Sequence, residues 1–264
     1  MLANLSRLFR YRGLVQTLVA RELKARYRGS VLGFFWSFVN PLLLLLVYTF
    51  VFTQVLPRGE EVDLEPYAVF LFCGLLPWTW FSSSLSESAN VLIINGNLIK
   101  KVMFPAEILP IVSVIANMFH FLFGLPILIA FLFFYAIPLH VAELVWFPFV
   151  MLVQFVLTLG FSMVLAALTV HFRDIKDLLM NVLTLWMFAS PIIYPMTWLS
   201  PRAKFFMDFN PFAHLAISYQ EILFYDGPFG HWKWLLALAV AGGGLFILGY
   251  ALFDRLRDSF AEEV

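Results

Sequence analysis

Apolar residues along the chain form six long runs, and short polar segments separate them. The runs cover residues 31–56, 67–85, 107–135, 142–170, 178–199 and 232–253. A helix that crosses a bilayer needs roughly 20 mostly apolar residues, because the hydrocarbon core is about 30 Å thick and a helix rises about 1.5 Å per residue. The pattern therefore predicts an all-α integral membrane protein with six transmembrane helices. Most of the runs contain proline, which predicts kinks in these helices.

A different pattern precedes the first run. A helical projection of residues 14–28 places aliphatic side chains on a broad side, opposite a basic stripe. The basic stripe consists of Arg21, Lys24 and Arg28. This amphipathic pattern predicts an interfacial helix whose cations lie near anionic lipid headgroups. Glu22 and Arg26 interrupt the apolar side at a spacing at which they can pair. Two interpretations stay open: the helix only anchors the topology, or its Glu22 and Arg26 side contacts a protein.

Composition supports the membrane interpretation and excludes most soluble classes. Of the residues, 62% are hydrophobic and 13% charged, and the mean hydropathy is +0.87. Soluble domains are about 45–50% apolar and about 25% charged. The formal net charge is zero, so bulk charge indicates no nucleic-acid partner. The single cysteine, Cys73, excludes an internal disulfide and a cysteine-built metal site.

The basic residues are distributed unequally between the two sides of the membrane. If the N-terminus is cytoplasmic, thirteen of the seventeen lysines and arginines fall in cytoplasmic segments. Because basic residues of short loops stay on the cytoplasmic side, this distribution predicts both termini in the cytoplasm. The chain then divides into a cytoplasmic N-terminal segment with the interfacial helix (1–30), a six-helix transmembrane domain (31–253) and a cytoplasmic tail (254–264).

The cytoplasmic loop between the second and third runs predicts a short helix at residues 98–104. Asn97 can cap its start, and Pro105 stops it about two turns later. Aliphatic residues share one face of this helix. The other face carries Lys100, Lys101 and Phe104. The helix either rests on the lipid surface with snorkelling lysines or presents an exposed contact surface to a partner.

Two other polar segments carry weaker patterns. Arg173 and Asp177, in the next cytoplasmic loop, stand four residues apart, so a local ion pair explains them adequately. The outer segment at residues 200–230 is too long for a turn and too mixed for a full span. It predicts two short interfacial helices that are interrupted at Asn210 and Pro211 and dip into the outer leaflet.

The sequence contains no recognisable catalytic or metal-binding motif. It lacks G-x-x-x-x-G-K-[ST], so we predict that this chain does not bind ATP through a P-loop. It also lacks His/Glu metal spacing and G-x-S-x-G, and we predict no catalytic residue and no metal ligand. Gly242–Gly244 lies inside the sixth run, where three glycines predict close packing of helices.

Five motifs follow one another in order over nearly the whole chain. They are Arg21-Glu22-Leu23-Lys24-x-Arg26-Tyr27-Arg28-x-Ser30-x-Leu32-Gly33-x-x-Trp36, then Asn97-Leu98-Ile99-Lys100-Lys101 with Phe104-Pro105 and Leu109-Pro110, then Phe172-Arg173-Asp174-Ile175, then Ser190-Pro191-Ile192-x-Tyr194-Pro195, and finally Asn210-Pro211. Together they resemble the permease subunits of type-2 ABC exporters, in particular those that move O-antigen, capsule or teichoic acid polymers.

The resemblance implies a multi-pass permease of the bacterial inner (plasma) membrane that works as a homodimer with two separate ABC ATPase subunits. It implies no cofactor in this chain, with ATP and Mg²⁺ bound by the partner ATPase. The short cytoplasmic helix then corresponds to a coupling helix that docks in a groove of the ATPase. The implied ATPase-coupling residues are Asn97, Lys100, Lys101, Phe104 and Pro105, together with Glu22 and Arg26.

Aromatic residues and a scarcity of charge characterise the predicted spans. Sugar rings stack on aromatic side chains, so a pathway with aromatic walls suits a lipid-linked polysaccharide better than a small ion. His120 with Asn117 is the main polar pair within the third run. The predicted substrate-pathway residues are Trp36, Tyr48, Phe52, Trp78 and Tyr194. A drug or lipid exporter of the same class, and a membrane-embedded transferase acting on lipid-linked sugars, remain alternatives.

Overall fold

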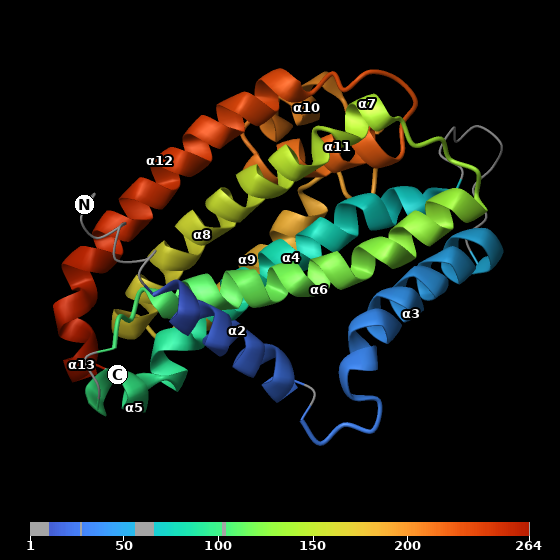
Figure 1. Cartoon of the computed structure of the whole chain (residues 1–264). Helices are drawn as coiled ribbons and strands as arrows, with labels where there is room; N and C mark the ends of the chain where they lie inside the picture. Colours follow the sequence, from blue (N-terminus) through green and yellow to red (C-terminus); the bar gives the residue numbers. More distant parts are fainter. Residues whose placement is uncertain (1–10, 27, 56–65, 102–103, 264) are drawn as a thin grey trace.

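The body of the protein consists of four long helices that lie side by side. The computed structural model describes residues 11–26, 28–55, 66–101 and 104–263, and every regular element within these ranges is a helix. The four long helices are α4 (Tyr67–Ile94), α6 (Ile108–Phe134), α8 (Phe147–His171) and α12 (Trp232–Leu256). They pack in the spatial order α12, α8, α4, α6 (Figure 1). The all-helical membrane fold predicted from the apolar runs is therefore confirmed.

Shorter helices surround this body and close its two ends. On its flanks, α2 (Arg12–Arg26) crosses α6, α3 (Trp36–Phe50) packs on α4 and α6, and α9 (Ile175–Phe188) packs on α4. One end carries α5 (Gly96–Lys101) and α13 (Phe260–Glu263), and the other end carries α7 (Val141–Leu144), α10 (Pro201–Met207) and α11 (Pro211–Leu223) (Figure 1). Three short 3₁₀ helices and one π-helical turn complete the described elements. The 3₁₀ helices are η1 (Gly33–Phe35), η3 (Met196–Trp198) and η4 (Arg257–Ser259), and the π-helical turn is η2 (Val51–Val55).

Within the described part of the chain, four of the six predicted spans are helices long and apolar enough to cross a membrane. These are Tyr67–Ile94, Ile108–Phe134, Val141–His171 and Trp232–Ser259. The first run forms a shorter apolar helix, α3, of 15 residues, which continues into the π-helical turn η2. Fifteen residues rise about 23 Å, which is less than the hydrocarbon thickness of about 30 Å.

The prediction of one continuous helix at residues 178–199 was wrong. α9 ends at Phe188, and the chain then turns through Pro191 and Pro195. Proline has no backbone N–H and disfavours helical geometry in the residue before it, so neither position continues a helix. The side-chain amide of Asn210 donates to the carbonyl oxygen of Ala189 at 2.9 Å, which satisfies an acceptor at the broken end. The prediction relied on hydropathy alone, which does not reveal that these two prolines interrupt the helix.

α8 and α12 approach each other closely at two glycines. A Cβ atom added at Gly249 would lie 2.6 Å from the carbonyl oxygen of Gly160, and one added at Gly160 would lie 2.8 Å from the backbone nitrogen of Phe246. The two backbones therefore touch at these glycines. Gly242–Gly244 was predicted to have this role. A Cβ atom added at Gly242 would make only ordinary contacts with Leu157, and one added at Gly243 or Gly244 would meet no described atom within 4 Å beyond its own helix backbone.

Candidate functional site

α2 lies on α6 through the apolar side that the sequence predicted. Leu18 and Val19 are buried and pack against Ile108 and Val112 of α6. The three residues of the basic stripe are exposed. The amphipathic pattern is thus confirmed, and part of its apolar side is covered by α6.

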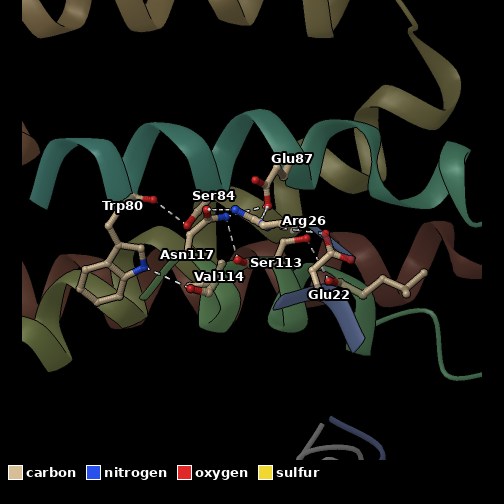
Figure 2. Close-up of polar contacts among 9 residues, drawn as sticks. Glu22, Arg26, Trp80, Ser84, Glu87, Ser113, Val114 and Asn117 are labelled. Carbon is tan, nitrogen blue, oxygen red and sulfur yellow. Dashed lines mark hydrogen bonds and ion pairs between the residues drawn. The ribbon is translucent and has the colours of Figure 1, made fainter. Parts of the chain in front are cut away.

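Arg26, the last residue of α2, reaches between α4 and α6. Its Nη2 donates to Oε2 of Glu87 at 2.6 Å, and its Nη1 donates to Oδ1 of Asn117 at 3.1 Å (Figure 2). The side-chain nitrogen of Asn117 donates in turn to the same Glu87 oxygen at 2.7 Å and to the carbonyl oxygen of Ser113 at 2.9 Å. One guanidinium, one carboxylate and one amide therefore connect three helices. We call Arg26, Glu87 and Asn117 the polar cluster.

The polar cluster is a strong contact because its members complement one another in charge and hydrogen-bonding capacity. The planar guanidinium presents two donors in a fixed fork, which fits a carboxylate and an amide oxygen at once. Asn117 is buried, and the side chains of Arg26 and Glu87 are 22% and 36% exposed. A buried charge is costly without its partner, so each member requires the others. The cluster fixes the end of α2 relative to α4 and α6.

The predicted pairing of Glu22 with Arg26 is confirmed, with 3.8 Å between Oε1 of Glu22 and Nε of Arg26. The guanidinium nevertheless points to helices of its own chain. The hypothesis that this side of α2 also contacts a separate protein stays a prediction. Glu22, which lies in α2, flanks the ion pair between Arg26 and Glu87 (Figure 2).

A cavity of about 490 Å³ opens beside the polar cluster, between α2, α3, α4 and α6. Its polar lining residues include Arg26, Trp36, Asn40, Thr79, Asn117 and His120. The indole nitrogen of Trp36 donates to the hydroxyl of Ser30 at 2.9 Å. The predicted pathway residue Trp36 and the predicted polar pair His120 and Asn117 thus line one cavity within a single chain.

The predicted short helix between α4 and α6 exists, but its ends differ from the prediction. α5 spans Gly96–Lys101, so Asn97 lies inside it and does not cap it. The backbone carbonyl of Asn95 instead accepts the first hydrogen bonds, from the N–H groups of Leu98 and Ile99. Asn97 and Lys100 are exposed, as a contact surface requires.

Phe104 does not lie on the exposed face of this helix. It follows α5 in an irregular segment with Pro105, is half-buried and packs on the apolar clusters around Leu109 and Ile108. Its predicted exposure was wrong, because Phe104 lies outside the helix and its ring packs on apolar clusters formed by several helices. Residues 102 and 103 lie outside the described residues, as does the side chain of Lys101.

The predicted aromatic pathway residues fall into different environments. Trp78 is buried and packs edge-on against Phe212 at 4.7 Å between ring centroids, so it stabilises the helix bundle and we remove it from the predicted pathway. Tyr48 is half-buried against the main apolar core. The hydroxyl of Tyr194 donates to the carbonyl oxygen of Phe188 at 2.8 Å. The side chain of Phe52 lies outside the described residues.

At the opposite end of the bundle, Asn210 joins three segments. Its side-chain oxygen accepts from the N–H groups of Phe212 and Ala213, which caps α11, and from the indole of Trp186 at 2.7 Å. Its side-chain nitrogen donates to Ala189 and to the hydroxyl of Ser190 at 3.0 Å. The predicted pair of short helices with a break at Asn210 and Pro211 is confirmed as α10 and α11.

Two histidines connect α11 to the start of α12. Nδ1 of His214 lies 2.9 Å from Nε2 of His231, and the His214 ring stacks on Trp234 at 4.6 Å. Burial lowers the pKa of His214, and burial together with the neighbouring His214 lowers the pKa of His231 to about 4. Both rings are therefore neutral near pH 7. A neutral pair can share one hydrogen bond, whereas two imidazolium ions would repel each other.

Sequence reasoning missed Glu87 as a functional residue. The available signal was a single carboxylate in an otherwise uncharged helix, because ionisable residues at membrane depth are costly and need a partner. The partner, Arg26, lies 61 positions earlier, and no local pattern connects the two. Within the residues that the structure describes, no group of three or more His, Cys, Asp or Glu gathers where it could hold a metal ion.

Comparisons with known proteins agree with one another. The sequence model described as "ABC-2 type transporter" matches residues 13–224. The chain is 39% identical to the O-antigen export system permease protein RfbA of Myxococcus xanthus over 97% of both chains. It is 34% identical to the protein of the same name from Klebsiella pneumoniae, over 98% of this chain and 96% of that protein. It is 24% identical to the polysialic acid transport protein KpsM of Escherichia coli over 76% of this chain and 78% of that protein.

Proposed function

Because this chain belongs to the ABC-2 type transporter family, we propose that it is the permease subunit of an ATP-driven exporter that moves a lipid-linked polysaccharide across the bacterial inner membrane. The similarity to O-antigen export permeases over nearly the full length of both chains is the observation that carries this proposal. The weaker similarity to a polysialic acid transport protein extends it to polysaccharides as a class.

The energy comes from a separate ATPase, which binds ATP and Mg²⁺. The sequence has no P-loop of its own, so this chain depends on a partner for ATP hydrolysis. In this proposal α5 is the coupling helix, and its exposed Asn97 and Lys100 contact the ATPase, with Lys101 next to them. The polar cluster is the next link, because it ties α2 to α4, the helix that leads directly into α5. A rigid connection of this kind transmits a rigid-body movement.

The functional unit is a dimer of this chain with both termini in the cytoplasm. α9 exposes Leu178, Leu185 and Phe188, and α3 exposes several large aliphatic residues. These apolar faces need cover from lipid or from a second copy. In this arrangement α3 and α9 complete the six predicted spans, although each is too short to cross a flat bilayer of average thickness. Trp36, Tyr48 and Tyr194 contribute to the pathway between the two copies.

A deletion experiment tests the substrate class. Removing the gene is expected to deplete polysaccharide from the cell surface while lipid-linked polymer accumulates inside, and the wild-type chain restores export. The double variant Lys100→Glu and Lys101→Glu is expected to reach the membrane without restoring export. Lys233→Glu, a reversal of an exposed lysine at the other end, is the matched control.

A normal amount of surface polysaccharide in the deletion strain would refute the proposal. If the same strain instead became sensitive to a drug or lost an exported lipid, the chain would be a permease for that substrate. If the chain were a membrane transferase, the deletion strain would contain truncated polymer, and complete polymer would not accumulate inside the cell.

A further inference from the structure

The segment that follows α12 packs on the helix bundle. η4 and α13 follow α12 directly, and α13 contacts α5 and α8 (Figure 1). Phe260, the first residue of α13, is fully buried, and its ring lies edge-on to Phe253 with 5.0 Å between centroids. A buried aromatic ring removes a large apolar area from water, so Phe260 anchors the end of the chain.

Polar contacts also fix the residues that directly precede Phe260. The hydroxyl of Ser259 lies 3.0 Å from Nε2 of His171, at the end of α8. Nη1 of Arg257 lies 3.7 Å from Oε1 of Glu107, which directly precedes α6. Glu107 is only 5% exposed, and a buried carboxylate requires compensation from a nearby cation or a helix N-terminus. Arg257 supplies the cation and thereby ties the chain end to α6.

α5 needs such support because it cannot be stable alone. It has six residues, and isolated helices shorter than about 12 residues are marginal in water. Its stability must come from packing, and Ile99 packs on the apolar cluster that includes Leu92 of α4, Leu109 of α6 and Phe260 of α13. α13 is therefore part of the surface on which α5 rests.

We propose that the segment Arg257–Glu263 is a brace that positions α5 for the ATPase, with Phe260 and Arg257 as its positioning residues. This inference rests on the proposed function, in which α5 is the coupling helix. Force applied to α5 moves the bundle only if α5 does not yield relative to α4, α6 and α8. The brace contacts α5, α6 and α8 at once, and it joins them to α12 through the continuous chain.

Proteolysis of the full-length permease in inside-out vesicles tests the brace without any substrate. Trypsin cleaves after Lys100 only when α5 opens locally, so Phe260→Ala is expected to raise the cleavage rate about tenfold. Phe260→Leu, which retains most of the apolar volume, is expected to keep the wild-type rate. Glu262→Ala changes an exposed residue of the same helix and is the matched control. If Phe260→Ala does not reach the membrane, Arg257→Gln provides the same test, because its side chain is exposed.

Export and ATPase binding are then measured on the same variants. The Phe260→Ala variant is expected to retain the ATPase on co-purification but to export polysaccharide at least about tenfold more slowly than wild type. The Phe260→Leu variant is expected to export at the wild-type rate. An unchanged cleavage rate at Lys100 would overturn the brace, and so would faster cleavage with undiminished export. If the wild-type chain exported no polysaccharide, the proposed function would fail, and the cleavage rates alone would still decide whether the brace holds α5.

Discussion

Replacing Arg26 with glutamine is expected to loosen α2 from the bundle. The substitution removes the charge and the fork that bind Glu87 and Asn117, while the apolar contacts of Leu18 and Val19 stay in place. Among the described residues, Glu87 then keeps the hydrogen bond from Asn117 alone. The substitution therefore tests the polar cluster separately from the apolar contact between α2 and α6, which we call the hydrophobic seat of α2.

The magnitude follows from the partial burial of the pair. Removing one partner of a fully buried ion pair costs about 3–5 kcal/mol, whereas an exposed pair contributes about 0–1 kcal/mol. The side chains of Arg26 and Glu87 are 22% and 36% exposed, so water can partly compensate. We expect a cost between these limits, about 2 kcal/mol. Because 1.36 kcal/mol corresponds to a factor of ten, the open population of α2 is expected to rise about 30-fold.

Cysteine labelling measures that population. Val19→Cys places a thiol in the buried seat of α2, and the native Cys73 is fully buried. The labelling rate of this thiol by a maleimide in membrane vesicles reports local opening. Adding Arg26→Gln is expected to raise the rate about 30-fold, whereas Arg21→Gln, which removes the same charge from the exposed stripe, is expected to change it less than about twofold. Equal rates for the two variants would refute the role assigned to the polar cluster.

Three other outcomes follow from the structure. Asn210→Ala is expected to lower the free energy of unfolding by about 3 kcal/mol, because it removes a helix cap and several hydrogen bonds, and a melting temperature equal to that of wild type would contradict this. Gly249→Ala is expected to destabilise the protein by about 1–3 kcal/mol through overpacking, while Gly243→Ala is expected to be neutral, so equal melting temperatures would exclude the assigned close contact. The pKa values of His214 and His231 in the folded state lie below their ordinary value, so the unfolded chain binds more protons than the folded chain as the pH is lowered. The free energy of unfolding is therefore expected to decrease as the pH is lowered from about 6.5 to about 4. A double replacement of these histidines by glutamine is expected to flatten the melting temperature over this range, and an equally steep decline in that variant would contradict the assignment.

The sequence was sufficient for features that depend on local periodicity. The four long helices follow from apolar runs of sufficient length, and the seat of α2 follows from its helical projection. The break between α10 and α11 follows from the turn chemistry of Asn210 and Pro211. Each of these inferences uses residues within one or two turns of one another.

Features that depend on contacts between distant segments could not be predicted. The polar cluster combines Arg26 with Glu87 and Asn117, which lie 61 and 91 positions away. The inward turn of Phe104 likewise depends on apolar clusters formed by several helices, so its amphipathic projection was misleading. Local patterns specify which face of a helix is apolar, but the choice of partner is decided by tertiary packing.

The most direct test of the account is ATP hydrolysis in proteoliposomes that contain this permease and its ATPase. Lipid-linked polysaccharide is expected to stimulate hydrolysis by the wild-type complex several-fold. The Lys100→Glu and Lys101→Glu double variant is expected to abolish this stimulation without a loss of basal hydrolysis. Hydrolysis that is indifferent to lipid-linked polysaccharide, in a complex that remains assembled, would contradict the claim that this chain couples ATP hydrolysis to polysaccharide export.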